Sequence, residues 1–297
     1  MKERATVVGL GEVLWDVFAD GPRFGGAPAN FASSMAELAG NRFDVFMVSQ
    51  VGRDELGQRA LQALRENGVD TRYVPSVERP TGQVFVKLNP DGQASYEFAA
   101  DTAWDDLKPS PELAQLAAQT DAVCFGALGQ RAAGSRETIQ RFLRETPPGC
   151  LRVLDLNLRP PFWTRDVVRQ SLEFANVLKL NVEELAVLAD MLELTGGSHQ
   201  RLQQLMEDFS LNAAALTRGA DGATLVSQSG ESSELPGQPV VVADTVGAGD
   251  SFTAVLVIGL LNGLSLDVIN AWGNRVAAYV CTQPGAAPTL PADLRRP

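Results

Sequence analysis

Asp250 is a carboxylate that follows three small residues, Gly247, Ala248 and Gly249, and opens an apolar segment ending at Leu261. Glycines let successive backbone N–H groups converge on an anion, and a helix that starts there adds unpaired N–H groups and the positive end of its dipole. A carboxylate beside such a site can take the proton of a hydroxyl that attacks a phosphoryl group. The stretch therefore indicates phosphoryl transfer, unless it is an ordinary turn in which Asp250 caps the helix.

A second pair of glycines, Gly25 and Gly26, precedes Asn30. Two glycines let the backbone approach a ligand closely, and the Asn30 amide can donate to and accept from a polyol. Asp16 follows the first expected strand, and a carboxylate binds vicinal hydroxyls by accepting two hydrogen bonds. These residues are candidates for sugar binding. The alternatives are a plain loop with an Asn cap and a solvated loop acid.

Polar residues also follow several later strands. Arg159 precedes two prolines in an extended loop, where its planar guanidinium suits a phosphate or a carboxylate. Asn181 and Glu184 begin a helix directly after a strand. Glu184 there either acts on Mg²⁺ through water or simply complements the helix dipole. Thr217 to Gly222 contains two glycines, and a tight hairpin turn explains it without a ligand.

Several enzyme classes are excluded by motifs that are missing. The chain has no Gly-Lys-Ser/Thr motif, and the two glycines after its first expected strand lack the third glycine of a dinucleotide fingerprint. The only histidine, His199, is expected on the surface in a loop at residues 195–200. Histidine-based catalytic triads and histidine-rich metal sites are therefore excluded.

Charge and cysteine usage limit the partners and the compartment. The 297 residues carry a net charge of −11, which argues against nucleic acid or an anionic membrane surface as a partner. The longest apolar run, residues 254–261, is far below the roughly 20 residues of a membrane-spanning helix. Cys124, Cys150 and Cys281 are odd in number and form no C-x-x-C pair, so we expect structural thiols in a reducing cytoplasm.

Strands alternate with helices along most of the chain, which predicts an α/β fold with a largely parallel sheet and helices on both faces. Strands are expected at residues 5–9, 43–51, 122–125, 152–156, 177–180, 213–217 and 224–226. Helices are expected at residues 30–40, 55–67, 135–145, 164–174, 182–190, 249–261 and 265–281. Residues 82–99 alternate apolar and polar around Asn89-Pro90-Asp91-Gly92, which predicts a β-hairpin appended to this fold. Ligands of such sheets bind at the carboxyl ends of the strands.

The order of these motifs resembles that of the ribokinase-like sugar kinases, the PfkB carbohydrate kinase family, from about residue 9 to residue 289. Residues 25–30 resemble the first signature of this family, and residues 244–250 resemble its second signature in full. The pairs Asn181 and Glu184, and Thr217 and Gly219, match two further elements. The resemblance implies a three-layer α/β sandwich with a mainly parallel central sheet. It also implies one domain, residues 1–297, with a small β-sheet lid from segments at about 13–24 and 80–101.

The resemblance also implies a role for each motif. Asp250 would be the catalytic base, and the backbone amides of Gly247, Ala248 and Gly249 would bind the phosphoryl charge. The sugar would contact Asp16, Gly25, Gly26, Asn30 and Arg159, with Arg159 also able to reach the γ-phosphate. ATP and its Mg²⁺ would contact Asn181, Glu184, Thr217, Gly219, Gly222 and Asn274, with Glu184 acting on Mg²⁺ through water. A monovalent cation, potassium, would lie near Asp244 and residues 281–286.

Two segments, residues 11–16 and 155–163, are similar to those of bacterial fructokinases, although Leu158 stands where tryptophan is often found. The resemblance therefore implies ATP-dependent phosphorylation of fructose at a terminal hydroxyl. Ribokinase and 2-keto-3-deoxygluconate kinase remain alternatives, as does a sensor on the same fold that binds sugar or nucleotide without catalysis. Relatives of this kind often form homodimers through the lid.

Overall fold

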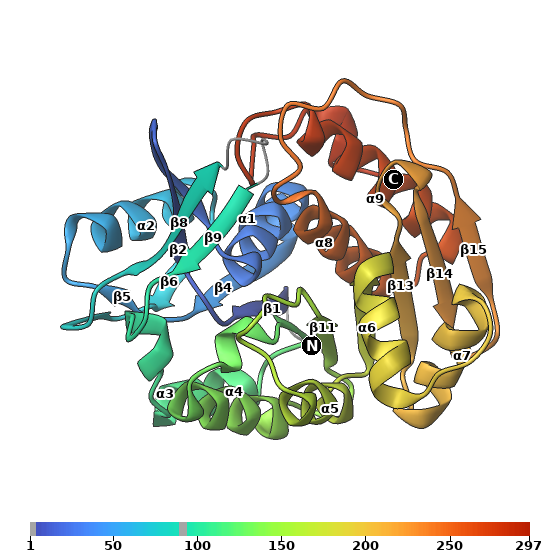
Figure 1. Cartoon of the computed structure of the whole chain (residues 1–297), viewed down its shortest axis with the longest axis horizontal. Coiled ribbons are helices and arrows are strands. Elements are labelled where there is room, and N and C mark those ends of the chain that lie inside the picture. The colour runs from blue at the N-terminus through green and yellow to red at the C-terminus, as the bar shows by residue number, and fades with distance from the viewer. Residues whose placement is uncertain (1–3, 89–93) are drawn as a thin grey trace.

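A nine-stranded sheet forms the centre of the protein, for which the computed structural model describes residues 4–88 and 94–297 (Figure 1). Its strands, in spatial order, are β15 (Ser232–Leu235), β14 (Ala223–Ser227), β13 (Ala213–Thr217), β12 (Val177–Asn181), β11 (Leu151–Asp155), β10 (Ala122–Phe125), β1 (Ala5–Leu10), β4 (Phe43–Val48) and β6 (Asp70–Tyr73). Neighbours from β6 to β13 are parallel, whereas β14 and β15 are added antiparallel. The predicted α/β fold class is confirmed.

Helices cover both faces of this sheet, because successive strand side chains point to opposite faces and both faces are apolar. Val7 packs into one buried cluster and its neighbour Val8 into the other. One face carries α1 (Ala27–Ala39), α2 (Glu55–Glu66), α8 (Ala248–Leu261) and α9 (Leu266–Cys281). The other face carries α3 (Pro111–Ala117), α4 (Ala133–Glu145), α5 (Arg165–Phe174), α6 (Val182–Leu192) and α7 (Ser198–Asp208).

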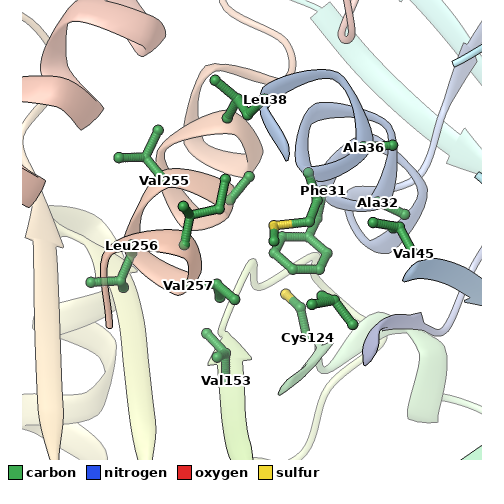
Figure 2. Close-up of a cluster of buried hydrophobic side chains, with 14 of the residues drawn as sticks. Phe31, Ala32, Ala36, Leu38, Val45, Cys124, Val153, Val255, Leu256 and Val257 are labelled. Atoms are coloured by element: carbon green, nitrogen blue, oxygen red, sulfur yellow. The ribbon is translucent and has the colours of Figure 1, made fainter. Parts of the chain in front are cut away.

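Helix α8 is apolar on all sides, as befits a helix buried between neighbours rather than one at the surface. Its residues from Asp250 to Gly259 are all buried. Phe31 of α1 and Val257 of α8 belong to one buried cluster, which also contains Cys124 and Val153 from the sheet (Figure 2). Close packing of this kind holds the first turn of α8 in one place.

A second, smaller sheet lies to one side of the central sheet (Figure 1). Its strands, in spatial order, are β3 (Gly21–Gly25), β2 (Leu14–Phe18), β8 (Gly82–Leu88) and β9 (Ala94–Phe98). Strands β8 and β9 pair antiparallel, as a hairpin requires, although the turn expected at residues 89–92 lies outside the described residues. Leu14 and Val84 pack on Trp104 beneath this sheet. Two short strands, β5 (Val51–Gly52) and β7 (Ser76–Val77), form a separate parallel pair.

Several sequence expectations for local structure are wrong. His199 is exposed as expected, but it lies in α7 rather than in a loop, because the Gln200 side chain accepts the Gly197 N–H at 2.9 Å and α7 begins at Ser198. Helix α1 begins at residue 27 instead of 30, and the strand expected at residues 43–51 ends at residue 48. The polar elements α3, α7, β6 and β15 were not expected. Within residues 4–88 and 94–297, no helix is both long and apolar enough to cross a membrane.

Candidate active site

The carboxyl ends of the central strands bring distant polar residues to one edge of the sheet, as parallel strands do. Asp155 ends β11 and is the register partner of Lys179 on β12. Two residues later, Asn181 is the register partner of Thr217 on β13. The sheet therefore places residues from three separate sequence motifs side by side.

Asp250 lies in the first turn of α8 and faces α1. The Asn30 side-chain Nδ2 donates to Asp250 Oδ2 at 2.8 Å, and both side chains are buried. The residue that caps α8 is Gly247, and no side-chain cap hydrogen bond is present. The alternative that Asp250 is a helix cap is therefore wrong. The carboxylate is instead directed to the loop side of the sheet by a contact from another helix.

The turn before Asp250 requires glycine at position 247 and leaves little room for a side chain at position 249. A Cβ on Gly247 would lie 1.9 Å from the Ala286 carbonyl oxygen, and its φ of +80° is one that other residues rarely adopt. A Cβ on Gly249 would lie 2.7 Å from Lys179 Nζ. Within the described residues, the N–H groups of Gly247, Gly249 and Asp250 have no hydrogen-bond acceptor, and the Ala248 N–H makes a long bond of 3.4 Å to the Thr245 carbonyl. This turn can therefore offer free amides and the positive end of α8 to an anion.

A buried lysine lies under this turn, and the sequence analysis did not assign it a role. Lys179 Nζ donates to Asp155 Oδ1 at 3.0 Å, and Thr253 Oγ1 of α8 donates to Asp155 Oδ2 at 2.8 Å. Both members of the ion pair are almost fully buried. The ion pair therefore connects β11 and β12 to α8. A charged residue within the apolar strand at residues 177–180 was the available signal, because charges inside a sheet are rare unless paired.

The charges around Asp250 set its affinity for a proton. Burial, and then the negative charge of Asp155, raise the pKa of Asp250 to about 6. Lys179, the Asn30 hydrogen bond and Arg159 act in the opposite direction. A carboxylate with a pKa near 6 is ionised at neutral pH and holds a proton better than an ordinary aspartate, which are the properties required of a general base.

The expected sugar-binding residues gather where the small sheet meets the start of α1. Asp16 is half-buried on β2, and a Cβ on Gly25 would lie 2.8 Å from its Oδ2. Gly26 caps α1 with a φ of +108°, and a Cβ there would lie 2.6 Å from the Glu12 carbonyl oxygen. Burial raises the pKa of Asp16 to about 6, while the positive charge of Arg159 acts to lower it. Arg159 itself is exposed in the loop after β11.

Glu12 is a second residue that the sequence analysis missed. It is 2% exposed, and its Oε2 has no hydrogen-bond partner among the described residues. Burial raises the pKa of Glu12 to about 7, with a smaller upward contribution from Asp250 and an opposing one from Arg159. The Oδ1 atom of Asn30 is also buried without a partner in the described structure. Buried polar atoms of this kind are candidates for hydrogen bonds to a ligand.

The residues expected to contact Mg²⁺ form a capping box at the start of α6. Asn181 Oδ1 accepts the Glu184 N–H at 2.8 Å, and Glu184 Oε2 accepts the Asn181 N–H at 2.9 Å. The other oxygen of Glu184 accepts the Leu158 N–H at 2.9 Å, which fixes the Arg159 loop to α6. The described part of the chain contains no cluster of three His, Cys, Asp or Glu side chains placed to hold a metal directly.

The residues expected to contact ATP lie further along the same side of the sheet. Thr217 ends β13, and Gly219 and Gly222 form the turn into the antiparallel strand β14. A Cβ on Gly222 would lie 2.1 Å from the Leu235 carbonyl oxygen, so the turn itself requires glycine. Asn274 is buried on α9, where its Nδ2 donates to Asn270 Oδ1 at 2.8 Å. Its contact with ATP stays a prediction.

Asp244 ties two loops together beside the start of α8. Its Oδ1 accepts the Val246 N–H at 3.0 Å and its Oδ2 accepts the Gly285 N–H at 3.3 Å. The Ala243 N–H donates to the Cys281 carbonyl at 2.8 Å, which joins the same two segments. The residues expected near a monovalent cation are thus neighbours in space.

Comparison with known proteins agrees with this arrangement. Residues 10–293 match the pfkB family carbohydrate kinase. A fructokinase of Klebsiella pneumoniae is 31% identical over an alignment of 310 positions, which covers 97% of this chain and 97% of that protein. The crystal structure of a sugar kinase from Pyrococcus horikoshii has 26% identity and a TM-score of 0.81, covering 95% of this chain and 94% of that chain. A fructokinase structure from Xylella fastidiosa with bound ATP, at 24% identity, has a TM-score of 0.82 and shares the fold over 96% of this chain and 95% of that chain.

The protein is therefore a phosphotransferase that acts on a sugar hydroxyl. The chain belongs to the PfkB family of carbohydrate kinases, and the resemblance read from its motifs is confirmed.

Proposed function

We propose that the protein transfers the γ-phosphate of ATP to a terminal hydroxyl of fructose. The observation that carries this proposal is the position of Asp250, which is buried beside the free amides of the α8 start and is oriented by Asn30. The fructokinase relative from Klebsiella pneumoniae, similar over almost the whole chain, supports fructose as the acceptor.

In the proposed reaction, Asp250 accepts the proton of the sugar hydroxyl as the hydroxyl oxygen attacks the γ-phosphorus. The amides of Gly247, Ala248 and Gly249 and the α8 dipole stabilise the negative charge on the transferring group. The ammonium group of Lys179, which is paired with Asp155, lies under the same turn. Asp16, Gly25, Gly26 and Asn30 hold the sugar, and Arg159 contacts the sugar or the γ-phosphate.

The residues present fit ATP and its metal ion. The free amides at the start of α8 suit a phosphate, and Thr217, Gly219, Gly222 and Asn274 would hold the rest of the nucleotide. Each Glu184 oxygen accepts one backbone N–H, which leaves lone pairs for water on Mg²⁺, a cation that prefers oxygen ligands. Mg²⁺ would reduce the charge on the phosphates. Asp244 would help to hold K⁺ near the same loops.

A panel of acceptors with coupled ADP detection tests the acceptor. We expect the highest kcat/KM with fructose, compared with ribose, 2-keto-3-deoxygluconate and nucleosides. A clear preference for ribose or for the keto-acid sugar would replace the fructose proposal by one of the two alternatives. Calorimetry that shows sugar binding with no turnover would favour a sensor. Repeating the assay without Mg²⁺, and with Na⁺ in place of K⁺, tests the two ions.

We also propose that the small sheet acts as a lid over the site and forms the interface of a homodimer. We place the protein in the reducing cytoplasm. Phe85 on β8 is a large apolar side chain that is 38% exposed, whereas its register partner Val17 on β2 is partly buried against the core. Phe85→Glu should shift a dimer to monomer in size-exclusion chromatography with light scattering. A wild-type protein that is monomeric at all concentrations would contradict the proposed homodimer.

A further inference from the structure

Arg131 follows β10 and makes a buried ion pair that joins the core to the small sheet. Its Nε donates to Asp105 Oδ1 at 2.7 Å, and its Nη2 donates to Asp105 Oδ2 at 2.7 Å and to the Ala99 carbonyl at 2.6 Å. Ala99 directly follows β9, and its own N–H donates to the Gln83 carbonyl on β8. Arg131, which lies beyond the carboxyl end of β10, is thus hydrogen-bonded to the residue that follows β9 of the small sheet.

The Arg131 guanidinium also lies close to two aromatic rings. Its Cζ is 4.1 Å from the centre of the Trp104 ring and 5.0 Å from the centre of the Phe162 ring. Phe162 in turn packs on Phe98 of β9, with ring centres 5.0 Å apart. A desolvated guanidinium over two rings forms a favourable cation–π contact. The rings come from different segments, so Arg131 fixes their relative position.

Phe162 belongs to the loop that carries Arg159. The Phe162 N–H donates to the Arg159 carbonyl at 2.8 Å, which closes a turn between the two residues. The loop is held at its other side by the bond from the Leu158 N–H to Glu184. A shift of the Phe162 ring therefore moves the backbone from which the Arg159 guanidinium projects.

We propose that Arg131 is a positioning residue that couples the place of the small sheet to the place of Arg159, through Phe162. This inference rests on the proposed function, in which Arg159 contacts the sugar or the γ-phosphate. When the small sheet is in the position described here, Arg131 and the Phe98–Phe162 pair hold the Arg159 loop toward Asp16 and Asp250. The alternative is a purely structural role, in which the Arg131–Asp105 pair only stabilises the fold.

Steady-state kinetics on five single variants and one double variant distinguish the two interpretations. The single variants are Arg131→Lys, Arg131→Met, Phe162→Leu, Arg159→Met and Arg141→Met, and the double variant combines Arg131→Met with Phe162→Leu. Phe162→Leu removes the ring contact and leaves the Arg131–Asp105 ion pair intact, so it is informative even if Arg131→Met folds poorly. Arg141 is paired with Glu145 on the surface of α4 and serves as the matched control for the loss of an arginine. Circular dichroism melts report folding for every variant.

We expect Phe162→Leu and Arg131→Met to change the same kinetic constant that Arg159→Met changes, by about 10- to 100-fold, because small displacements at a site have effects of this size. That constant is the KM for fructose if Arg159 contacts the sugar, and kcat or the KM for ATP if Arg159 contacts the γ-phosphate. Arg131→Lys should recover part of the loss, since it keeps the charge but not the planar fork. The effects of Arg131→Met and Phe162→Leu should be less than additive in the double variant, because they act on one contact.

The proposal is overturned if Phe162→Leu and Arg131→Lys keep the wild-type value of the kinetic constant that Arg159→Met changes. In that case Arg159 contributes to catalysis or substrate binding, but its position does not depend on Arg131, and the Arg131–Asp105 ion pair has only a structural role. If Arg159→Met itself leaves all kinetic constants unchanged, the proposed role of Arg159 fails first, and the coupling fails with it. Arg141→Met should match the wild type in either case.

Discussion

The Asn30 amide of α1 donates to the Asp250 carboxylate of α8 at 2.8 Å, across 220 positions of the chain. The two helices pack on the same face of the central sheet, in one apolar cluster. This packing fixes the positions of the Asn30 donor and the Asp250 acceptor, because each lies on a helix and not on a loop. The hydrogen bond therefore positions Asp250, the proposed base, and acts to lower its pKa, because it favours the charged form.

Asn30→Ala removes this donor, and the pKa of Asp250 should rise as a result. An ionised base is required, so the acid limb of the pH–kcat profile should move to higher pH. At neutral pH we expect kcat to fall by about 10-fold or more, the size expected for losing a hydrogen bond to a charged group. The profile is measured with saturating sugar and ATP. An acid limb at the wild-type pH would show that Asn30 does not act on Asp250.

Lys179→Met leaves Asp155 buried without its counterion. Breaking a buried ion pair by removing one partner costs about 3–5 kcal/mol, so we expect a loss of this size in the free energy of unfolding from urea titration. Lys108→Met is the control, since Lys108 pairs with Asp106 at the surface and its loss should have little effect. Equal stability of the two variants would contradict the role of Lys179 in joining β11 and β12 to α8.

Glu12→Gln tests the burial of an acid that has one oxygen without a partner among the described residues. The pKa of Glu12 is raised from 4.5 to about 7, so the folded chain binds more protons there than the unfolded chain between these values. The stability that Glu12 contributes is full below pH 4.5 and is lost as the pH rises through about 7, a change of about 3 kcal/mol. The glutamine variant does not titrate, so its stability relative to wild type should improve from about pH 5 to about pH 8. A pH-independent difference would contradict the raised pKa.

Gly249→Ala tests the anion-binding turn. The added Cβ would meet Lys179 Nζ at 2.7 Å, so either the turn or the lysine must move. We expect kcat to fall by about 100-fold, comparable to the loss of one donor in an oxyanion hole. Gly134→Ala in α4 is the matched control, because nothing lies within 4 Å of its Cβ and helical alanine is favoured. Similar activity of the two variants would mean that the turn takes no part in catalysis.

The sequence predicted the parts of the site that are local. The anion-binding turn at residues 247–250 was predicted from small residues that precede an apolar helix. The role of Asn181 and Glu184 was predicted from their spacing at the start of a helix. Lys179 was missed because its partner Asp155 lies 24 positions away and the contact depends on strand register. Glu12 was missed because its burial follows from the packing of α1 against the start of the small sheet.

The secondary structure also divides into elements that local patterns predicted and elements that they did not. The apolar strands and helices were predicted because burial imposes a period that the sequence displays. Elements with polar sequences, such as β6 and α7, were not, because their placement depends on tertiary contacts rather than on pattern. The Arg131–Asp105 pair also joins segments that show no local signal of contact.

Asp250→Asn tests the central claim most directly, because it keeps the shape of the side chain and removes its basicity. We expect kcat for fructose phosphorylation to fall by about 100- to 10,000-fold, the range for loss of a general base, while calorimetry shows ATP binding at the wild-type affinity. Asp190→Asn, an exposed position on α6, should match the wild type in the same assay. Near-normal turnover by Asp250→Asn would contradict the assignment of Asp250 as the base.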